Sequence, residues 1–231
     1  MRALSRIAVV IPALNEEQAI GLVLAEIPKL VSEIVVVDNG SRDRTADLAR
    51  AGGARVVSEA RRGYGQACLA GIAAVPDADV IGFLDADYSD YPAQLTDVLA
   101  PILAGQADLV IGSRNLGRRA AGAQPWHAVL GTRFCVFLMN TLVGTRATDL
   151  GPFRAISADG LRRLDMRDRN FGWTVEMQMK AARRGLRVVE VPVDYRPRVG
   201  ESKISGTFSG TVRAAAKILA TILYHAVARP A

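Results

Sequence analysis

Residues 80–90 read Val-Ile-Gly-Phe-Leu-Asp-Ala-Asp-Tyr-Ser-Asp, an apolar run that ends abruptly in carboxylates. The apolar part is typical of a strand that is buried on both faces. Asp85 and Asp87 follow where the chain turns, so both carboxylates can converge on one cation. Hard divalent cations such as Mg²⁺ and Mn²⁺ prefer oxygen ligands of this kind. The alternative is a helix N-cap before Pro92, for which Asp90 is the better placed residue.

The same alternation of apolar runs and polar ends extends through the first half of the chain. Strands are expected at residues 7–11, 34–37, 55–57, 80–84 and 109–111, separated by helices at 16–30, 41–51, 63–74 and 92–103. A β-α-β rhythm predicts an α/β fold with a Rossmann-like, mostly parallel sheet that is flanked by helices.

Four of these strands end in polar segments, namely Pro12-Ala-Leu-Asn-Glu16, Asp38-Asn-Gly-Ser41, Asp85-Ala-Asp87 and Gly112-Ser-Arg114. The carboxyl ends of parallel strands share one edge of the sheet, where ligands of such folds bind. The sequence therefore predicts an active site at this edge. Asp38 is suited to accept from a base or a ribose, or else to close an Asx turn. Gly63 and Gly65 precede a helix, where they would let the backbone approach an anion or simply form a turn.

The second half lacks this rhythm. Residues 115–125 are expected to form a mobile loop. The sequence further predicts an apolar helix at 128–143 that contains Arg133, strands at 153–156 and 188–193, a helix at 174–184, a polar loop at 196–205 and an amphipathic helix at 207–228. The apolar helix is either a core helix or faces lipid, and the last helix would lie on a membrane surface or mediate formation of a homo-oligomer.

Composition excludes several classes of protein. The 231 residues suit one domain with a sizeable core, and two cysteines and two histidines rule out a disulfide scaffold and a Cys/His zinc site. Aromatic residues make up only 6%, too few for the aromatic and basic surface of a nucleic-acid-binding protein. We find neither a signal peptide nor an uncharged apolar run of 18 residues, so no membrane span is expected.

Charge is distributed unevenly along the chain. Residues 1–110 carry a formal charge of −6 and residues 111–231 one of +12. A basic second half indicates an anionic partner or an anionic surface nearby.

The order of seven motifs resembles that of family 2 glycosyltransferases with the GT-A fold. The motifs are VVIPALNE (9–16), VVDNGS (36–41), RRGYGQA (61–67), FLDADYSD (83–90), VIGSR (110–114), TDLGPFRAI (148–156) and RVGESKIS (198–205). The resemblance spans about residues 6–210 and is strongest to dolichyl-phosphate mannose or glucose synthases and to bacterial polyprenyl-phosphate hexosyltransferases. It implies a single GT-A domain over 1–231, with a nucleotide-sugar half (1–114), an acceptor half (115–206) and a C-terminal amphipathic helix (207–231).

The resemblance also implies roles for individual residues. Those expected at the nucleotide sugar are Pro12, Ala13, Asn15, Glu16, Asp38, Gly63, Gly65 and Asp85, with Asp85 and Asp87 holding Mg²⁺ or Mn²⁺ on the diphosphate. Those expected at the acceptor phosphate are Arg114, Arg133, Arg196, Arg198, Ser202 and Lys203. In this branch a glutamine often stands two residues after the second motif aspartate and helps to hold the metal. Here that position is Ser89, which reaches less far, so water would replace it.

A phosphate acceptor needs cations rather than a general base, because it is already an anion and is itself the nucleophile. Asp87 and Arg114 are therefore the expected catalytic residues, and the basic second half suits such an acceptor. Asp149 and Glu176 are further candidates for a base. Their alternatives are an arginine-paired carboxylate for Asp149 and a helix-face residue for Glu176.

Three functional hypotheses follow. The first is a metal-dependent, inverting hexosyltransferase that uses a donor of the UDP-glucose or GDP-mannose type and polyprenyl phosphate. It would work in the cytoplasm, peripherally attached to the inner face of the cell membrane, and would not bind nucleic acid. The second keeps the donor and transfers the sugar to a hydroxyl group. The third is a nucleotide-sugar-binding module without turnover, against which the intact Asp85, Asp87 and Lys203 argue.

Overall fold

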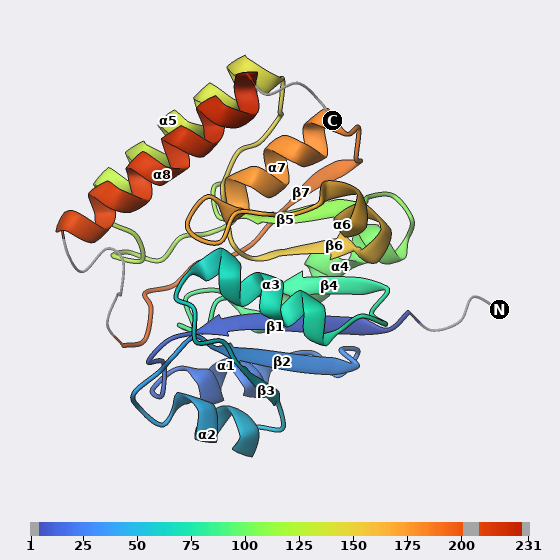
Figure 1. The fold of residues 1–231 in the computed structure, drawn as a ribbon, viewed down its shortest axis with the longest axis vertical. Helices are drawn as coiled ribbons and strands as arrows, with labels where there is room; N and C mark the ends of the chain where they lie inside the picture. The colour runs from blue at the N-terminus through green and yellow to red at the C-terminus, as the bar shows by residue number, and fades with distance from the viewer. Residues whose placement is uncertain (1–4, 201–207, 228–231) are drawn as a thin grey trace.

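The computed structural model describes residues 5–200 and 208–227, with side chains of 208–213 left out. Its centre is a seven-stranded sheet in the order β3-β2-β1-β4-β6-β5-β7 (Figure 1). The strands are β1 (Ile7–Ala13), β2 (Glu33–Asp38), β3 (Arg55–Ser58), β4 (Val80–Phe83), β5 (Leu109–Ser113), β6 (Arg154–Ser157) and β7 (Val188–Pro192). This α/β arrangement confirms the predicted fold class.

Strand β6 is the exception in the sheet. It pairs antiparallel with both β4 and β5, whereas the other neighbours pair in parallel. Arg154, at the start of β6, lies opposite Phe83 and Ile111. Because β6 runs the other way, the loop that precedes it arrives at the carboxyl ends of β4 and β5. Residues 148–153 are thereby brought to the same edge as Asp85 and Arg114.

Helices cover both faces of the sheet. One face packs against α1 (Ile20–Glu26), α2 (Thr45–Ala51) and α4 (Leu95–Leu103), which follows the short 3₁₀ turn η1 (Pro92–Gln94). The other packs against α3 (Tyr64–Ala74), α6 (Ala158–Leu164) and α7 (Trp173–Arg183). The small residues of α3 allow a close approach to the sheet, since a Cβ at Gly71 would lie 2.3 Å from a methyl group of Val10.

Two long helices form a further layer outside α7. They are α5 (Trp126–Val143) and α8 (Phe208–Val227), which lie side by side in Figure 1. Cys135, Val136 and Met139 of α5 pack with Ile222 of α8 and with residues of α7. The predicted helices at 128–143 and 207–228 are therefore confirmed to within a few residues over the described chain.

The expectation that no helix is suited to span a membrane needs correction. By length and apolar composition alone, α5 is long enough to cross a bilayer, and only 17% of its residues are buried. The count from the sequence missed it because Arg133 interrupts the apolar run. A single helix of this kind is weak support for a span, since helices of soluble proteins pass the same test.

Two other expectations were inaccurate in detail. The first helix is shorter than the predicted 16–30, because Ile27 takes an extended conformation before Pro28. A residue before proline is disfavoured in the helical region, so the helix ends there. Helix α6 was not predicted, although Ser157 caps it by accepting from the Gly160 N–H.

Candidate active site

A cavity of about 400 Å³ opens at the carboxyl ends of β1 and β4. Seven of the residues assigned to the site from the sequence line it, namely Pro12, Ala13, Glu16, Gly63, Asp85, Asp87 and Arg198. The structure thus brings together residues that are up to 186 positions apart in the chain. A cavity of this size can hold a small cofactor or substrate.

Asp85 and Asp87 both line this cavity. The Tyr64 hydroxyl donates to Asp85 Oδ1 at 3.0 Å, and the Ser89 N–H and hydroxyl both donate to Asp87 Oδ1 at 3.0 and 2.6 Å. Burial, aided by the negative charge of Asp87, raises the pKa of Asp85 to about 7. Two carboxylates that repel each other in a cavity fit a divalent cation. Because Ser89 donates both of its hydrogen bonds to Asp87, its role in this structure is to orient that carboxylate.

Residues 196–199, here called the strap, come from the second half of the chain and contact Asp87. Arg198 donates to Glu16 Oε1 at 2.7 Å, and its Nη1 lies 3.4 Å from Asp87 Oδ2. The backbone follows the same course, because the N–H of Val199 donates to the Asp87 carbonyl and that of Arg196 to the Ser89 carbonyl, both at 2.9 Å. The Arg198 charge thus lies beside the candidate metal ligand, which suits a diphosphate contact.

Arg196 is directed elsewhere. Its guanidinium lies over the rings of Tyr88 and Tyr91, with centroid distances of 3.3 and 4.2 Å, and it forms an ion pair with Glu26 at 3.2 Å. Arg196 therefore holds the strap in place. It does not line the cavity. Ser202 and Lys203 lie outside the described residues.

The segments after β1 and β2 hold each other in place. Asn15 has a positive φ of 52°, and its side-chain oxygen accepts from the Arg42 N–H at 2.7 Å. Asp38 accepts from the Ser41 N–H at 2.9 Å, which is the Asx turn named above as the alternative. Neither Asn15 nor Asp38 lines the cavity, whereas Asn39 does. A role for Asp38 at the base or ribose stays a prediction.

Gly63 and Gly65 are needed for contact between the two halves of the chain. A Cβ at Gly63 would lie 2.1 Å from the Arg169 carbonyl oxygen, and one at Gly65 would lie 2.1 Å from that of Asp168. Gly63 also has a φ of +145°, and the Arg169 carbonyl accepts from the Gln66 N–H. The close approach that the glycines permit is therefore to backbone, although Gly63 also borders the cavity.

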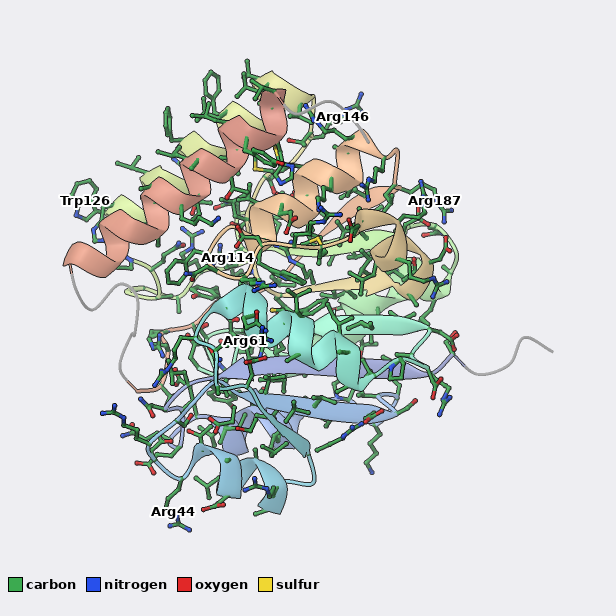
Figure 2. All side chains as sticks on the ribbon, in the orientation of Figure 1. Arg44, Arg61, Arg114, Trp126, Arg146 and Arg187 are labelled. Atoms are coloured by element: carbon green, nitrogen blue, oxygen red, sulfur yellow. The ribbon has the colours of Figure 1, made fainter. Side chains whose placement is uncertain are left out.

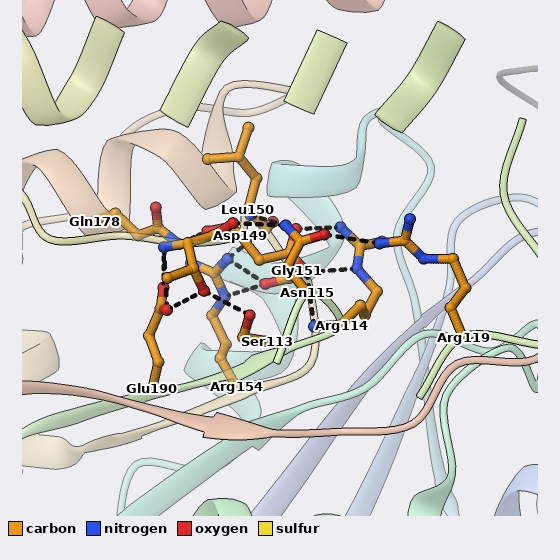
Figure 3. A network of polar contacts seen from close by, with 11 residues as sticks. Ser113, Arg114, Asn115, Arg119, Asp149, Leu150, Gly151, Arg154, Gln178 and Glu190 are labelled. Carbon is orange, nitrogen blue, oxygen red and sulfur yellow. Dashed lines mark hydrogen bonds and ion pairs between the residues drawn. The ribbon is translucent and has the colours of Figure 1, made fainter. Parts of the chain in front are cut away.

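Arg114 and Asp149 form a nearly buried ion pair (Figure 3). Arg114 donates from Nε and Nη2 to the two carboxylate oxygens at 2.7 Å each, and its backbone N–H adds a bond of 2.9 Å. These contacts hold the pKa of Asp149 below its ordinary value despite burial. A carboxylate so occupied is a poor base, and the arginine-pairing alternative fits the geometry.

Glu176 is likewise occupied. Its carboxylate forms an ion pair with Lys180 at 2.7 Å and accepts from the backbone N–H groups of Arg167 and Asp168. It does not line the cavity. Glu176 therefore holds the loop that meets Gly63 and Gly65, and a base role for it stays a prediction.

Arg133 is exposed on α5, away from the cavity. The outer face of α5 carries Trp126, Leu130, Phe134 and Phe137, of which Trp126 is 74% and Phe137 62% exposed. Figure 2 shows Trp126 directed away from the body of the protein. Of the two interpretations of this helix, the structure supports an outward apolar face, while its inner residues belong to a core cluster.

Comparison with known proteins decides the family. The family described as glycosyl transferase family 2 matches residues 8–164. The chain belongs to this family. The match includes six of the seven motifs, from residues 9–16 to 148–156, and ends before the motif at residues 198–205.

Several relatives of this glycosyltransferase are similar over most of their length. An uncharacterized glycosyltransferase of Mycobacterium tuberculosis is 40% identical over 208 residues, 89% of this chain and 93% of the relative. A dolichyl-phosphate hexose transferase of Haloferax volcanii is 36% identical, with 86% of each chain covered. An undecaprenyl-phosphate mannosyltransferase of Micrococcus luteus is 33% identical, with 89% and 90% covered.

A similar solved structure is glucosyl-3-phosphoglycerate synthase of Mycobacterium tuberculosis. In complex with Mn²⁺, UDP and glucosyl-3-phosphoglycerate it has a TM-score of 0.78 and 26% identity, covering 98% of this chain and 82% of that one. Another structure of that enzyme contains Mg²⁺ and UDP. The expected cofactor, Mg²⁺ or Mn²⁺, agrees with these structures.

Several residues of this glycosyltransferase's cavity were not singled out from the sequence. Asn39, Arg62, Tyr64, Asn170 and Phe171 all line it. The first three stand within motifs quoted above, and their neighbours were chosen instead. No local signal marks Asn170 and Phe171, because they reach the cavity only through the packing of their loop against Gly63 and Gly65.

Proposed function

We propose that this chain is a metal-dependent, inverting hexosyltransferase that moves a sugar from a nucleotide diphosphate donor to a polyprenyl phosphate. The donor is of the UDP-glucose or GDP-mannose type. Two findings support the proposal: a cavity with paired carboxylates at the carboxyl ends of the strands, and relatives that are named as polyprenyl-phosphate transferases.

On the donor side, Asp85 and Asp87 are the residues that would hold Mg²⁺ or Mn²⁺. The Tyr64 and Ser89 hydroxyl groups already orient one oxygen of each carboxylate. The second oxygen of Asp85 is left for a ligand, whereas that of Asp87 lies 3.4 Å from Arg198 Nη1. When bound, a divalent cation neutralises the diphosphate and stabilises it as a leaving group. Arg198, which lies beside Asp87, would contact the diphosphate as well.

The acceptor class rests on one observation: Asp149 and Glu176 are both engaged in ion pairs and backbone hydrogen bonds. A hydroxyl acceptor needs a base to remove its proton, whereas a phosphate does not. In the proposed reaction a phosphate oxygen attacks the anomeric carbon from the face opposite the diphosphate. The new C–O bond forms as the bond to the diphosphate breaks, so the configuration inverts.

A water-soluble acceptor is the second candidate. Glucosyl-3-phosphoglycerate synthase has nearly the same fold over 98% of this chain, and one of its structures contains glucosyl-3-phosphoglycerate. Both candidates share an acceptor that carries a phosphate group. They differ in whether the phosphate is joined to a lipid and in the group that accepts the sugar, which is a phosphate oxygen of the lipid or the free hydroxyl group of phosphoglycerate.

The outer face of α5 supports a site of action at the inner face of the cell membrane. Trp126, Leu130, Phe134 and Phe137 recur every three or four residues and so form one apolar stripe, with Arg133 exposed beside it. Apolar side chains edged with basic ones bind anionic membrane surfaces. A homo-oligomer formed through α5 and α8 is the alternative use of this stripe.

The proposed reaction is tested with the full chain, Mn²⁺ and each of UDP-glucose and GDP-mannose. Farnesyl phosphate and 3-phosphoglycerate are offered as acceptors in parallel, and products are identified by mass spectrometry. We expect the lipid phosphate to gain the mass of one hexose with one of the donors. Transfer to 3-phosphoglycerate alone would establish the second candidate instead.

Membrane binding is tested separately by sedimentation with vesicles of anionic phospholipid. We expect the protein to bind at low salt and to be released by raised salt, because screening weakens the attraction of the basic residues. Phe137→Ser should reduce binding, and Thr141→Ser, a change on the same helix that removes only one methyl group, should not. Binding that is unaffected by Phe137→Ser, together with a dimer in light scattering, would favour the oligomer.

A further inference from the structure

The charge of Arg114 is already balanced within the protein. Its Nε and Nη2 both donate hydrogen bonds to Asp149, and only about a tenth of its side chain is exposed. Tyr195 further covers it, with the ring centroid 5.1 Å from the guanidinium carbon. A neutral, covered pair attracts an incoming phosphate far less than a free cation does. The acceptor phosphate therefore needs a positive charge from another residue.

Arg119 is a neighbouring cation that is not balanced. It is half-buried and donates from Nη2 to Asn115 Oδ1 at 2.9 Å, beside the Arg114–Asp149 pair (Figure 3). Within residues 5–200 and 208–227, the structure records no carboxylate at ion-pair distance from it. Its Nε is buried and lacks an acceptor in that part of the chain. A buried N–H without an acceptor is unfavourable, and a phosphate oxygen would supply one.

The backbone fixes Arg119 close to the metal motif. Tyr195 forms a parallel bridge with Arg119 on one side and an antiparallel bridge with Asp90 on the other. Two such spacings place the backbone of Arg119 roughly 10 Å from that of Asp90. Hydrogen bonds of 2.8 and 2.9 Å between Tyr195 and residues 118 and 120 hold this arrangement. An arginine side chain spans much of this distance, and Asp90 stands three residues after Asp87 of the metal motif.

We infer that Arg119 binds the phosphate of the acceptor and that Arg114 is a positioning residue that holds the loop containing Asp149. The ligand class is a phosphate monoester, either lipid-linked or water-soluble. The inference rests on the proposed function only in taking the acceptor to carry a phosphate. Asn115 supports Arg119 from behind, since its Nδ2 donates to the Thr148 carbonyl at 2.6 Å.

The test compares Arg119→Gln with Arg119→Lys and with Arg118→Gln. Arg118 is a matched control, because it is the adjacent cation and is 92% exposed and paired with Asp194. Calorimetry measures binding of farnesyl phosphate and of 3-phosphoglycerate to each protein loaded with Mn²⁺ and UDP. We expect Arg119→Gln to weaken binding of at least one of them by about tenfold or more. Arg119→Lys should lose less, and Arg118→Gln should match the wild type.

Steady-state kinetics and thermal unfolding distinguish a loss of acceptor binding from a loss of protein structure. Arg119→Gln should raise the KM for the acceptor while the KM for the donor and the thermal midpoint stay as in the wild type. Unchanged phosphate affinity in Arg119→Gln, or a joint fall of kcat and thermal midpoint, would overturn the inference. Binding that depends on Arg119 without any transfer of hexose would uphold the inference and refute the proposed function. Retention of farnesyl phosphate but not 3-phosphoglycerate by the wild type would identify the lipid-linked source.

Discussion

The carboxylates of the two halves of the molecule have opposite surroundings. In the first half Asp85 is half-buried and Asp90 is buried, and in the described chain neither forms an ion pair with an arginine or lysine. In the second half Asp149 and Glu176 are buried, and each is paired with a cation at 2.7 Å. The comparison teaches that unmatched charge marks the place where a ligand supplies the counter-charge. Paired carboxylates instead hold the protein structure around that ligand site.

The largest expected effect comes from removing the carboxylate that stands beside unmatched Asp85 in the metal motif. Asp87→Asn should reduce transfer about a thousandfold or more, because the charge that holds the metal diphosphate is lost. The thermal midpoint should stay unchanged or rise, since repulsion with Asp85 is relieved. Transfer assays, calorimetry with Mn²⁺ and UDP, and thermal unfolding measure the three quantities.

Asp97→Asn is the control for this change, because Asp97 is an exposed carboxylate on α4. It should leave both rate and stability as they are. Full transfer by Asp87→Asn, or by the wild type in EDTA, would show that Asp87 holds no essential metal.

Breaking the matched pair should instead cost stability. Arg114→Met leaves the Asp149 carboxylate buried without its cation, a change that typically lowers the free energy of unfolding by about 3–5 kcal/mol. The double variant Arg114→Met, Asp149→Asn should regain part of this loss because no buried charge is left. Urea unfolding followed by circular dichroism measures both. If Arg114→Met is as stable as the wild type, the pair is not the structural unit described here.

Asp90 tests the same comparison through the pH dependence of protein stability. It is 1% exposed, neither carboxylate oxygen has a hydrogen-bond partner in the described chain, and burial raises its pKa well above 3.8. Folding raises the pKa of this acid, so the free energy of unfolding falls as the pH rises above the pKa of the unfolded state. The decrease continues until the pH passes the folded pKa.

Asp90→Asn should therefore be more stable than the wild type at neutral pH. The difference should grow by up to about 1.4 kcal/mol per pH unit above 3.8 and vanish near pH 3.8. Unfolding curves between pH 4 and 8 measure it. A difference that is constant over this range would mean that Asp90 does not titrate as its surroundings suggest.

The smallest effect is expected on the chemistry of Glu176 variants. Glu176→Gln should lower stability by about 1–3 kcal/mol, because two backbone N–H groups and Lys180 lose a charged acceptor. The kcat and its pH profile, measured well below the thermal midpoint, should stay within about twofold of the wild type, since a base would contribute a hundredfold or more. A loss of the basic limb of the pH profile would restore Glu176 as a base.

The sequence predicted the surroundings of Asp85 and Asp87 better than those of Arg114. Strands β1, β2 and β4 are continuous apolar runs, and their carboxyl ends must meet at one edge, so Asp85, Asp87 and residues 12–16 could be placed together. The same logic chose Asp38 over Asn39, because a strand pattern locates a segment without orienting its side chains.

The second half could not be assembled in this way. Strand β6 is inserted antiparallel between two strands that are distant in sequence, and no periodicity indicates that pairing. The partner of Arg114, 35 residues away, depends on this insertion. The contact of residues 168–169 with Gly63 and Gly65 likewise joins segments about 100 residues apart, beyond any local signal.

That glycine contact limits how the chain can be recombined with its relatives. Because the carbonyl groups of Asp168 and Arg169 lie where a side chain at Gly63 or Gly65 would stand, the two segments have no room to adjust independently. A chimera of residues 1–114 from one parent and 115–231 from another would separate the two segments, so its first parent must have glycine at positions 63 and 65. The crossover points open to an engineer, and to evolution by gene exchange, are therefore set by backbone packing as well as by the catalytic motifs.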